Sequence, residues 1–209
     1  MSCYSLLTMN SRRIYNPVQK DYVTFLQSTL ENGGQQTHCL MEVAPGGKVL
    51  LHYHQTYSES FIVRTGVLQV RIGNRELILH EGERATVPPG TLHRWANPGS
   101  QTAVADVIVE PGHLGFERTL QAAYGLARDG KARADGAPKS LFYLALLGEM
   151  SEIKLTGLSG RLGGLFRLLA WVARRLGKHQ ALEKYYLDFQ PEGPPIHSSV
   201  KSIGAYQRK

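Results

Sequence analysis

Two histidines and a glutamate stand close together in a stretch that is otherwise rich in apolar residues. The stretch GGKVLLHYHQTYSESFIVRTG covers residues 46–66, where His52 and His54 are two residues apart and Glu59 follows five residues later. Imidazole nitrogens suit several transition metals, and carboxylates bind divalent ions as well. Two histidines at this spacing are also common on half-exposed strands. These three residues alone are therefore compatible with two interpretations, a metal site or solvated side chains on a strand.

The spacing within this stretch fits donors that converge on one point. Residues two apart on a strand face the same side of the sheet. His52 and His54 can therefore both lean toward one ion, at about 2.0–2.2 Å. If Glu59, Phe61 and Val63 share one face of the next strand, they supply one carboxylate and an apolar wall.

A second set of regularly spaced residues begins 15 residues after the first set ends. The first set is Gly46, His52, His54, Glu59 and Gly66, and the second is Gly82, Pro88, Gly90, His93 and Asn97. Together they resemble the two signature motifs of the cupin superfamily, over roughly residues 35–110, and the chain resembles a small single-domain cupin of the cupin 2 type. The resemblance implies a barrel of antiparallel strands (a double-stranded β-helix, or jelly roll). It also implies that His52, His54, Glu59 and His93 bind one metal ion inside it.

The donor set leaves the metal and the reaction open. Three imidazoles and one carboxylate accept a divalent Mn, Fe, Ni, Co or Zn ion. An octahedral ion would keep two positions for water, dioxygen or substrate. Resemblance to metal-dependent cupin dioxygenases implies an oxygen-dependent oxidoreductase that acts on a small organic molecule. A metal-dependent isomerase or lyase and a non-catalytic small-molecule-binding cupin are the alternatives. No second acid–base residue is identifiable, so catalysis itself stays open.

The walls of the expected pocket are harder to read than its ligands. His93 and Trp95 alternate onto one face, so Trp95 lines the cavity or packs in the core. Phe61 and Val63 would add apolar wall beside Glu59. Cys39 and Met41 lie on an earlier strand and favour core packing.

Composition favours an ordinary globular protein in a reducing compartment. The chain has 209 residues, of which 42% are hydrophobic, enough to bury a substantial core. Its two cysteines, Cys3 and Cys39, do not indicate a disulfide framework. The first residues show no basic segment followed by a long apolar one, so we expect no signal peptide and a cytoplasmic location.

The residue pattern changes from β to α near residue 110. Short runs rich in Val, Leu, Ile and Thr alternate with Gly- and Pro-containing turns in the first half, which is typical of a mainly β sandwich or barrel. Helical periodicity follows in the second half, including leucines that step by three and four between Leu158 and Leu176. We therefore expect a cupin barrel over residues 1–110, an α-helical extension over 111–190 and an extended tail over 191–209.

The net charge of +7 lies entirely in the second half of the chain. Residues 1–110 carry equal numbers of basic and acidic residues, whereas a helix expected over 160–177 carries Arg161, Arg167, Arg174, Arg175 and Lys178. Such a helix can lie on an anionic membrane surface. The favoured alternative is that its leucines cover a neighbouring element while the arginines are solvated. No motif indicates nucleic-acid binding. The cupin resemblance implies a homodimer.

Overall fold

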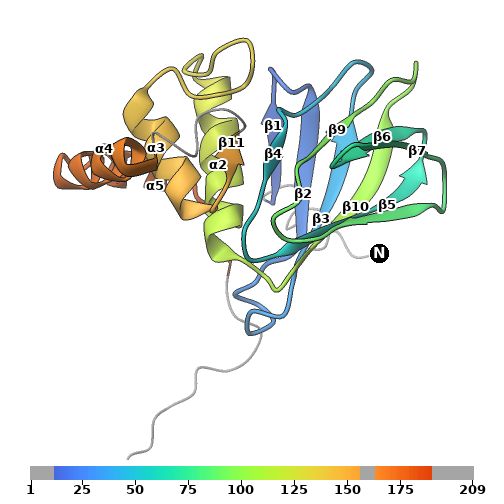
Figure 1. Cartoon of the computed structure of the whole chain (residues 1–209), viewed down its shortest axis with the longest axis horizontal. Helices are drawn as coiled ribbons and strands as arrows, with labels where there is room; N and C mark the ends of the chain where they lie inside the picture. The colour runs from blue at the N-terminus through green and yellow to red at the C-terminus, as the bar shows by residue number, and fades with distance from the viewer. Residues whose placement is uncertain (1–11, 156–162, 190–209) are drawn as a thin grey trace, which may run out of the picture.

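Two antiparallel sheets and a group of helices make up the described part of the chain (Figure 1). The computed structural model describes residues 12–155 and 163–189. The sheets lie on one side of the molecule and the helices on the other. This division agrees with the predicted change from strands to helices near residue 110. The fold class is therefore a mainly β, barrel-like fold followed by helices, and this prediction is confirmed.

The larger sheet has six strands in the order β1-β2-β3-β10-β5-β8. Its members are β1 (Arg13–Asn16), β2 (Asp21–Gln27), β3 (Thr37–Val43), β5 (Ser58–Thr65), β8 (Arg84–Val87) and β10 (Ala103–Glu110). Burial alternates along β3, where every second residue points into the interior. This period of two is what one buried face of a sheet requires.

The smaller sheet has five strands in the order β11-β4-β9-β6-β7. Its members are β4 (His52–Tyr53), β6 (Leu68–Ile72), β7 (Arg75–Leu79), β9 (His93–Ala96) and β11 (Lys154–Leu155). The hairpin of β6 and β7 turns through two residues, Gly73 and Asn74, because Ile72 pairs with Arg75. β1 and β11 are short, with four and two residues.

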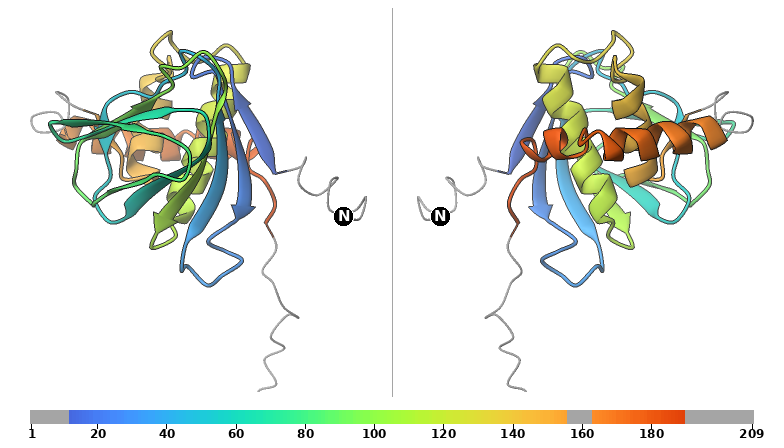
Figure 2. Two further views of the ribbon diagram at one scale, coloured as in Figure 1. Left: turned by 90° about the vertical axis from the view of Figure 1, so that its right-hand side faces the viewer. Right: turned by 90° about the vertical axis from the view of Figure 1, so that its left-hand side faces the viewer.

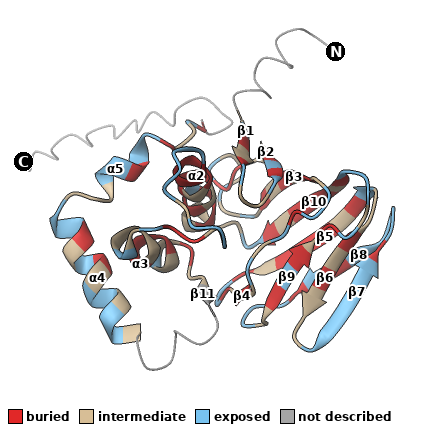
Figure 3. Ribbon diagram, turned by 90° about the horizontal axis from the view of Figure 1, so that it is seen from above, coloured by how far each residue is buried: buried red, intermediate tan, exposed pale blue. Residues whose placement is uncertain are grey.

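The core of the barrel lies between the two sheets. The larger sheet contributes Phe25, Cys39 and Met41, and the smaller contributes Val70 and Trp95, all at most 6% exposed. Cys39 and Met41 thus pack in the core, as expected. Figure 3 shows buried residues along the central strands and a largely exposed β7 at the sheet edge.

The helices form a second layer beside the barrel. Its members are α2 (Leu114–Arg128), α3 (Leu141–Met150), α4 (Gly163–Arg175) and α5 (Gln180–Glu183). α2 lies next to β1, and α3 packs against both α2 and α4. The right-hand view of Figure 2 shows α4 at the front, on the side of the helices away from the barrel. The barrel and the helices therefore share an extended contact through α2.

A buried carboxylate fixes α2 to the barrel. Glu117 is fully buried and accepts hydrogen bonds from Ser28 Oγ at 2.5 Å, Thr29 N at 2.6 Å and Thr37 Oγ1 at 2.6 Å. A buried carboxylate without such partners would strongly destabilise the fold. Because all three partners lie at the connection from β2 to β3, they set the position of α2 along the barrel.

The leucines expected to cover a neighbouring element form the buried face of α4 only in part. Leu169 packs against the helical core, and Ala170 and Ala173 are fully buried. Leu165 of α4 and Leu176, directly after it, are 48% and 61% exposed. Small side chains let α4 approach α3 closely, so the alanine face makes the contact. Leu158, Leu162 and Arg161 lie outside the described residues. Contact of this helix with an anionic membrane surface stays a prediction, as does the cytoplasmic location.

No helix in residues 12–155 and 163–189 combines the length and the apolar character needed to cross a bilayer.

Candidate metal centre

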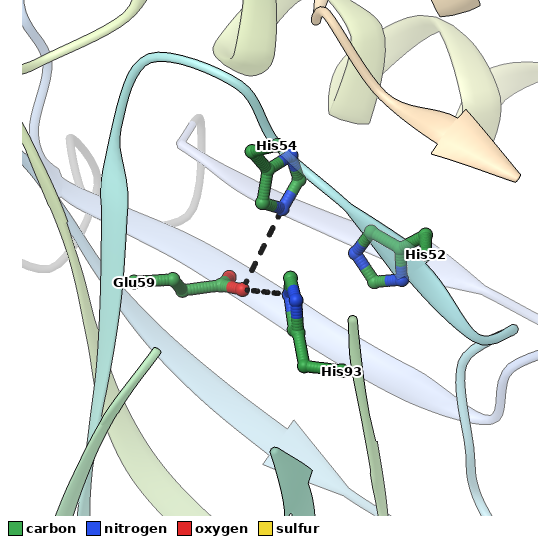
Figure 4. A group of neighbouring side chains, drawn as sticks. All are labelled: His52, His54, Glu59 and His93. Atoms are coloured by element: carbon green, nitrogen blue, oxygen red, sulfur yellow. Dashed lines mark hydrogen bonds and ion pairs between the residues drawn. The ribbon is translucent and has the colours of Figure 1, made fainter. Parts of the chain in front are cut away.

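The four residues expected to bind metal come together between the two sheets. His52 on β4 pairs directly with His93 on β9 in the smaller sheet, and Glu59 lies on β5 in the larger one. His54 follows β4 and completes the group. Their ligand atoms all lie within 4.8 Å of one another, and all four side chains are buried (Figure 4). The quartet therefore joins both sheets of the barrel.

Turn residues of the two motifs bring the ligands together. The motif glycines at positions 46, 66, 82 and 90 all have positive φ angles, between +73° and +81°. Residues other than glycine rarely adopt this backbone conformation. The Gly90 amide donates to the His54 carbonyl at 2.6 Å, which ties the second motif to the first. These turns place His54 and His93 on the same side of the barrel.

The other two motif positions stabilise the strand ends around His93. β8 ends at Val87, directly before Pro88, whose ring cannot continue the strand ladder. Asn97 follows β9, and its Nδ2 donates to Val43 O at 2.8 Å while its Oδ1 accepts from Gly99 N at 2.9 Å. Asn97 therefore ends the strand through side-chain to backbone hydrogen bonds.

Each histidine of the quartet has a hydrogen-bond partner on its Nδ1 atom. The pairs are His52 with Leu50 O at 2.6 Å, His93 with Thr91 O at 2.9 Å, and His54 with Tyr57 Oη at 2.6 Å. A carbonyl oxygen only accepts, so His52 and His93 donate from Nδ1. Tyr57 donates its own proton to Ser151 O at 2.9 Å and therefore accepts from His54. In its neutral form each ring thus carries its lone pair on Nε2, the tautomer that a metal requires at that atom.

The Nε2 atoms provide the test of whether a metal fits. His54 Nε2 is buried and has no hydrogen-bond partner among the described residues, since Glu59 Oε2 is 3.7 Å away. His93 Nε2 lies 2.9 Å from the same Glu59 oxygen. Donors about 2.0–2.2 Å from one ion lie roughly 3–4.4 Å from each other. A buried lone pair without a partner is costly, so the group fits one bound cation.

The electrostatics of the centre favour the metal-binding protonation state at His52 and Glu59. Burial, together with the neighbouring His93 and His54, lowers the pKa of His52 to about 3. Burial alone would raise the pKa of Glu59, but hydrogen bonds and charge from His54 and His93 hold it below its usual range. His52 is therefore neutral and Glu59 ionised at neutral pH, as metal ligands must be. Burial lowers the pKa of His93, but the hydrogen bond and the charge of Glu59 outweigh it and raise that pKa above its ordinary value, so a metal competes with a proton at this ring.

A cavity of about 800 Å³ lies between the barrel and the helices, and His52 is the one member of the quartet that lines it. Leu50 and Tyr53 of the barrel, together with residues of α2, α3 and α4, form its walls. The volume is in the range of small-molecule sites. The cavity therefore connects solvent with the His52 side of the centre.

The three residues expected to line the pocket lie elsewhere in the interior. Phe61, Val63 and Trp95 are buried in the core between the sheets, and none of them lines the 800 Å³ cavity. Phe61 and Val63 do share the inward face of β5 with Glu59, as the period of two predicts. Their role at a pocket stays a prediction.

Sequence reasoning missed the residues that orient the ligands. Tyr57 lies inside the first motif, but nothing in its spacing marks it as a partner of His54. Its other partner, Ser151, is 94 residues further along the chain. Leu50 and Thr91 act through backbone carbonyls, which leave no trace in side-chain type. These hydrogen-bond partners of the histidines can be identified only from the folded structure.

Comparisons with known proteins match the barrel part of the chain. Residues 39–110 match the sequence profile of the family described as Cupin domain. A mannose-1-phosphate guanylyltransferase of Sinorhizobium fredii is 32% identical over 96 residues, which are 46% of this chain and 19% of that protein. The alginate biosynthesis protein AlgA of Pseudomonas aeruginosa is 28% identical over 120 residues, 56% of this chain and 24% of that protein. The matches thus span about a fifth to a quarter of these relatives' length.

Solved structures similar to this chain include an RmlC-like cupin from Shewanella frigidimarina, with a TM-score of 0.43 and 17% identity, over 49% of this chain and 86% of that one. Another is the protein TT1209 from Thermus thermophilus, with a TM-score of 0.42 and 25% identity, over 46% of this chain and 88% of that one. Together, the profile match, both motifs and the antiparallel barrel show that residues 39–110 form a small cupin domain.

Proposed function

We propose that this cupin binds one divalent transition metal ion through His52, His54, Glu59 and His93 and uses it to act on a small organic molecule. The observation that carries the proposal is the buried Nε2 atom of His54, which has no hydrogen-bond partner among the described residues. Fixed Nδ1 donors on all three histidines support it, because they direct three lone pairs to one point. The 800 Å³ cavity beside His52 supplies a route for the organic molecule.

The donor set suits a reaction at open coordination positions. A bound ion would supply Lewis acidity or redox chemistry there, and an octahedral ion would keep two positions beyond the four protein ligands. Glu59 would lower the positive charge of the site, and the three histidines would hold the ion in place as neutral ligands. The expected class is an oxygen-dependent, dioxygenase-like oxidoreductase, the class that the cupin resemblance implies.

A metal-dependent isomerase or lyase is the second candidate. The names of two curated relatives suggest a sugar phosphate as its substrate, because one is a mannose-1-phosphate guanylyltransferase and the other, AlgA, is named for alginate biosynthesis. The cavity can offer such a molecule hydrogen bonds, since Gln19, Gln55 and Thr119 are among its lining residues. A sugar phosphate would be a substrate that needs no dioxygen.

The metal-binding part of the proposal is tested by elemental analysis of protein purified without a nickel column. We expect about one equivalent of a divalent transition metal in the natural chain and a large loss of metal in His52→Ala and in Glu59→Gln. A surface variant, His80→Ala, is the control, because His80 lies in the connection between β7 and β8, outside the quartet. Unchanged metal content in His52→Ala would show that the site is wrongly assigned.

The reaction class is tested with protein reconstituted with Fe, Mn, Ni, Co or Zn under anaerobic conditions. Oxygen uptake with phenols, flavonols, diketones or thiols would support the oxidoreductase. Turnover of sugar phosphates without oxygen would support the isomerase or lyase. Thermal stabilisation by a ligand without any product would indicate a non-catalytic binding protein instead.

A further inference from the structure

The segment that follows α3 runs along β4, the strand that carries His52 and directly precedes His54. We call residues 151–155 the docking segment. Its end forms β11, which pairs antiparallel with β4, so that Lys154 lies opposite Tyr53 and Leu155 opposite His52. β4 has only two residues and pairs with β9 on its other side. The helical half of the chain therefore supplies one of the two neighbours of the ligand strand.

Two side-chain contacts extend this pairing beyond β4. Tyr57 donates from its hydroxyl to Ser151 O at 2.9 Å, and the same hydroxyl accepts from His54 Nδ1 at 2.6 Å. Thr56 donates to Glu152 Oε2 at 2.8 Å at the surface. Tyr57 is 1% exposed and Ser151 is fully buried, so water does not compete for the inner contact. The docking segment thus reaches a metal ligand through a single hydroxyl group.

Other contacts hold the docking segment in one conformation. Ser151 Oγ donates to Leu147 O at 2.7 Å, which ties the segment to the last turn of α3. Glu152 has a φ angle of +56°, a conformation that residues other than glycine rarely adopt. Strained backbone of this kind persists only where the surroundings determine it. The Ser151 carbonyl is therefore presented to Tyr57 by a fixed turn.

From this geometry we propose that Tyr57 is a positioning residue, through which the docking segment orients His54 and couples the helical extension to the metal centre. The proposal rests on the proposed function, since it concerns a ligand of that same site. With the Ser151 carbonyl accepting its proton, the Tyr57 hydroxyl offers His54 Nδ1 a lone pair and keeps the His54 lone pair on Nε2. Partners of this kind around a ligand typically change metal affinity by about 10–100-fold when removed.

The coupling has to act in both directions. If the docked segment favours metal binding, then a bound metal favours the docked segment by the same factor. Opening of the segment is visible as hydrogen exchange of its backbone amides. Metal should therefore slow exchange in residues 151–155, although none of them is a ligand.

The test is the variant Tyr57→Phe, which removes the hydroxyl and keeps the ring that stacks on His54 with centroids 4.4 Å apart. We expect about 10–100-fold weaker Co²⁺ binding in a chelator competition and a changed visible spectrum of the Co²⁺-loaded protein. In the metal-free protein we expect faster hydrogen exchange in residues 151–155. That last measurement needs no metal, so it tests the contact apart from the proposed function.

Tyr185→Phe is the matched control. Its hydroxyl donates to Asp129 Oδ2 at 2.6 Å within the helical half, away from the quartet. We expect unchanged Co²⁺ affinity and spectrum in this variant. Unchanged affinity in Tyr57→Phe, with metal binding lost in His52→Ala, would overturn the coupling and leave the metal site standing. Failure of the natural chain to bind any metal would overturn both proposals.

Discussion

At the scale of single residues, the four proposed ligands could be predicted from the sequence, but their orientation could not. Side-chain type and spacing reveal His52, His54, Glu59 and His93, because metal chemistry restricts which residues can serve. What sets the tautomers is a pair of backbone carbonyls and the Tyr57 hydroxyl. A carbonyl is present at every position of a chain, so nothing in the sequence distinguishes the two that matter.

A second buried carboxyl, Asp21, gives a prediction about pH. Asp21 is fully buried at the start of β2, and Tyr124 donates a hydrogen bond to its Oδ2 atom. Burial raises its pKa from 3.8 to about 7 despite that hydrogen bond. The folded state therefore prefers the protonated form. The resulting stability is fully present below pH 3.8 and is lost as the pH rises through about 7.

We expect Asp21→Asn to remove this pH dependence, since asparagine stays neutral. Between pH 5 and pH 8, the free energy of unfolding of the natural chain should fall by about 2–3 kcal/mol relative to the variant. Urea unfolding of both proteins at the two pH values measures the difference. Asp135→Asn is the control, because the pKa of Asp135 is lowered and it does not titrate in this window. Parallel pH profiles for the natural chain and Asp21→Asn would refute the prediction.

At the scale of elements, the alternating strands were predictable and the pairings across the chain were not. Residues of β3 show the period of two along their own sequence. β11 has two residues and gains its place only by pairing with β4, about 100 residues earlier in the chain. α4 shows the same limit. Its leucine pattern indicates a helix correctly, but tertiary contact with α3 selects Ala170 and Ala173 as the buried face.

Close approach of α2 to the end of α3 gives a prediction at this scale. A Cβ atom on Gly115 of α2 would lie 1.8 Å from Met150 O, which directly precedes the docking segment. Gly115→Ala should therefore destabilise the fold by about 1–3 kcal/mol, although alanine favours helix by up to about 1 kcal/mol. On Gly148 of α3, the nearest atom to such a Cβ is Ile153 O at 3.6 Å, an ordinary contact.

Gly148→Ala is thus the matched control, and it should be neutral or more stable by up to about 1 kcal/mol. Chemical denaturation of the two variants measures the contrast. Equal stability of Gly115→Ala and Gly148→Ala would mean that α2 and α3 are further apart than described. Opposite signs would confirm the close approach that presents Ser151 to Tyr57.

At the scale of the whole molecule, the sequence suggests two halves that the structure joins. Charge is balanced in residues 1–110 and basic in 111–209, yet the contacts of Glu117, Tyr124 and the docking segment all cross this boundary. The domain limits drawn at residues 110 and 190 stay predictions, and so does the homodimer, which light scattering would test. Composition reveals that the residue pattern changes near residue 110, but it does not reveal the contacts between the barrel and the helices on either side of that boundary.

Metal removal tests whether the two halves unfold as one unit. The quartet draws ligands from both sheets, and the docking segment connects it to the helices. Metal at 100 times its dissociation constant should add about 2.7 kcal/mol to the free energy of unfolding. For a chain of this size, the melting temperature should then rise by roughly 5–10 °C. Trp95 lies in the barrel and Trp171 on α4, so fluorescence is measured in a Trp171→Phe background and then reports the barrel. We expect the same rise in helical circular dichroism and in Trp95 fluorescence, and no rise in His52→Ala. If only the fluorescence midpoint moves, the helices unfold independently, because metal bound in the barrel then leaves their stability unchanged.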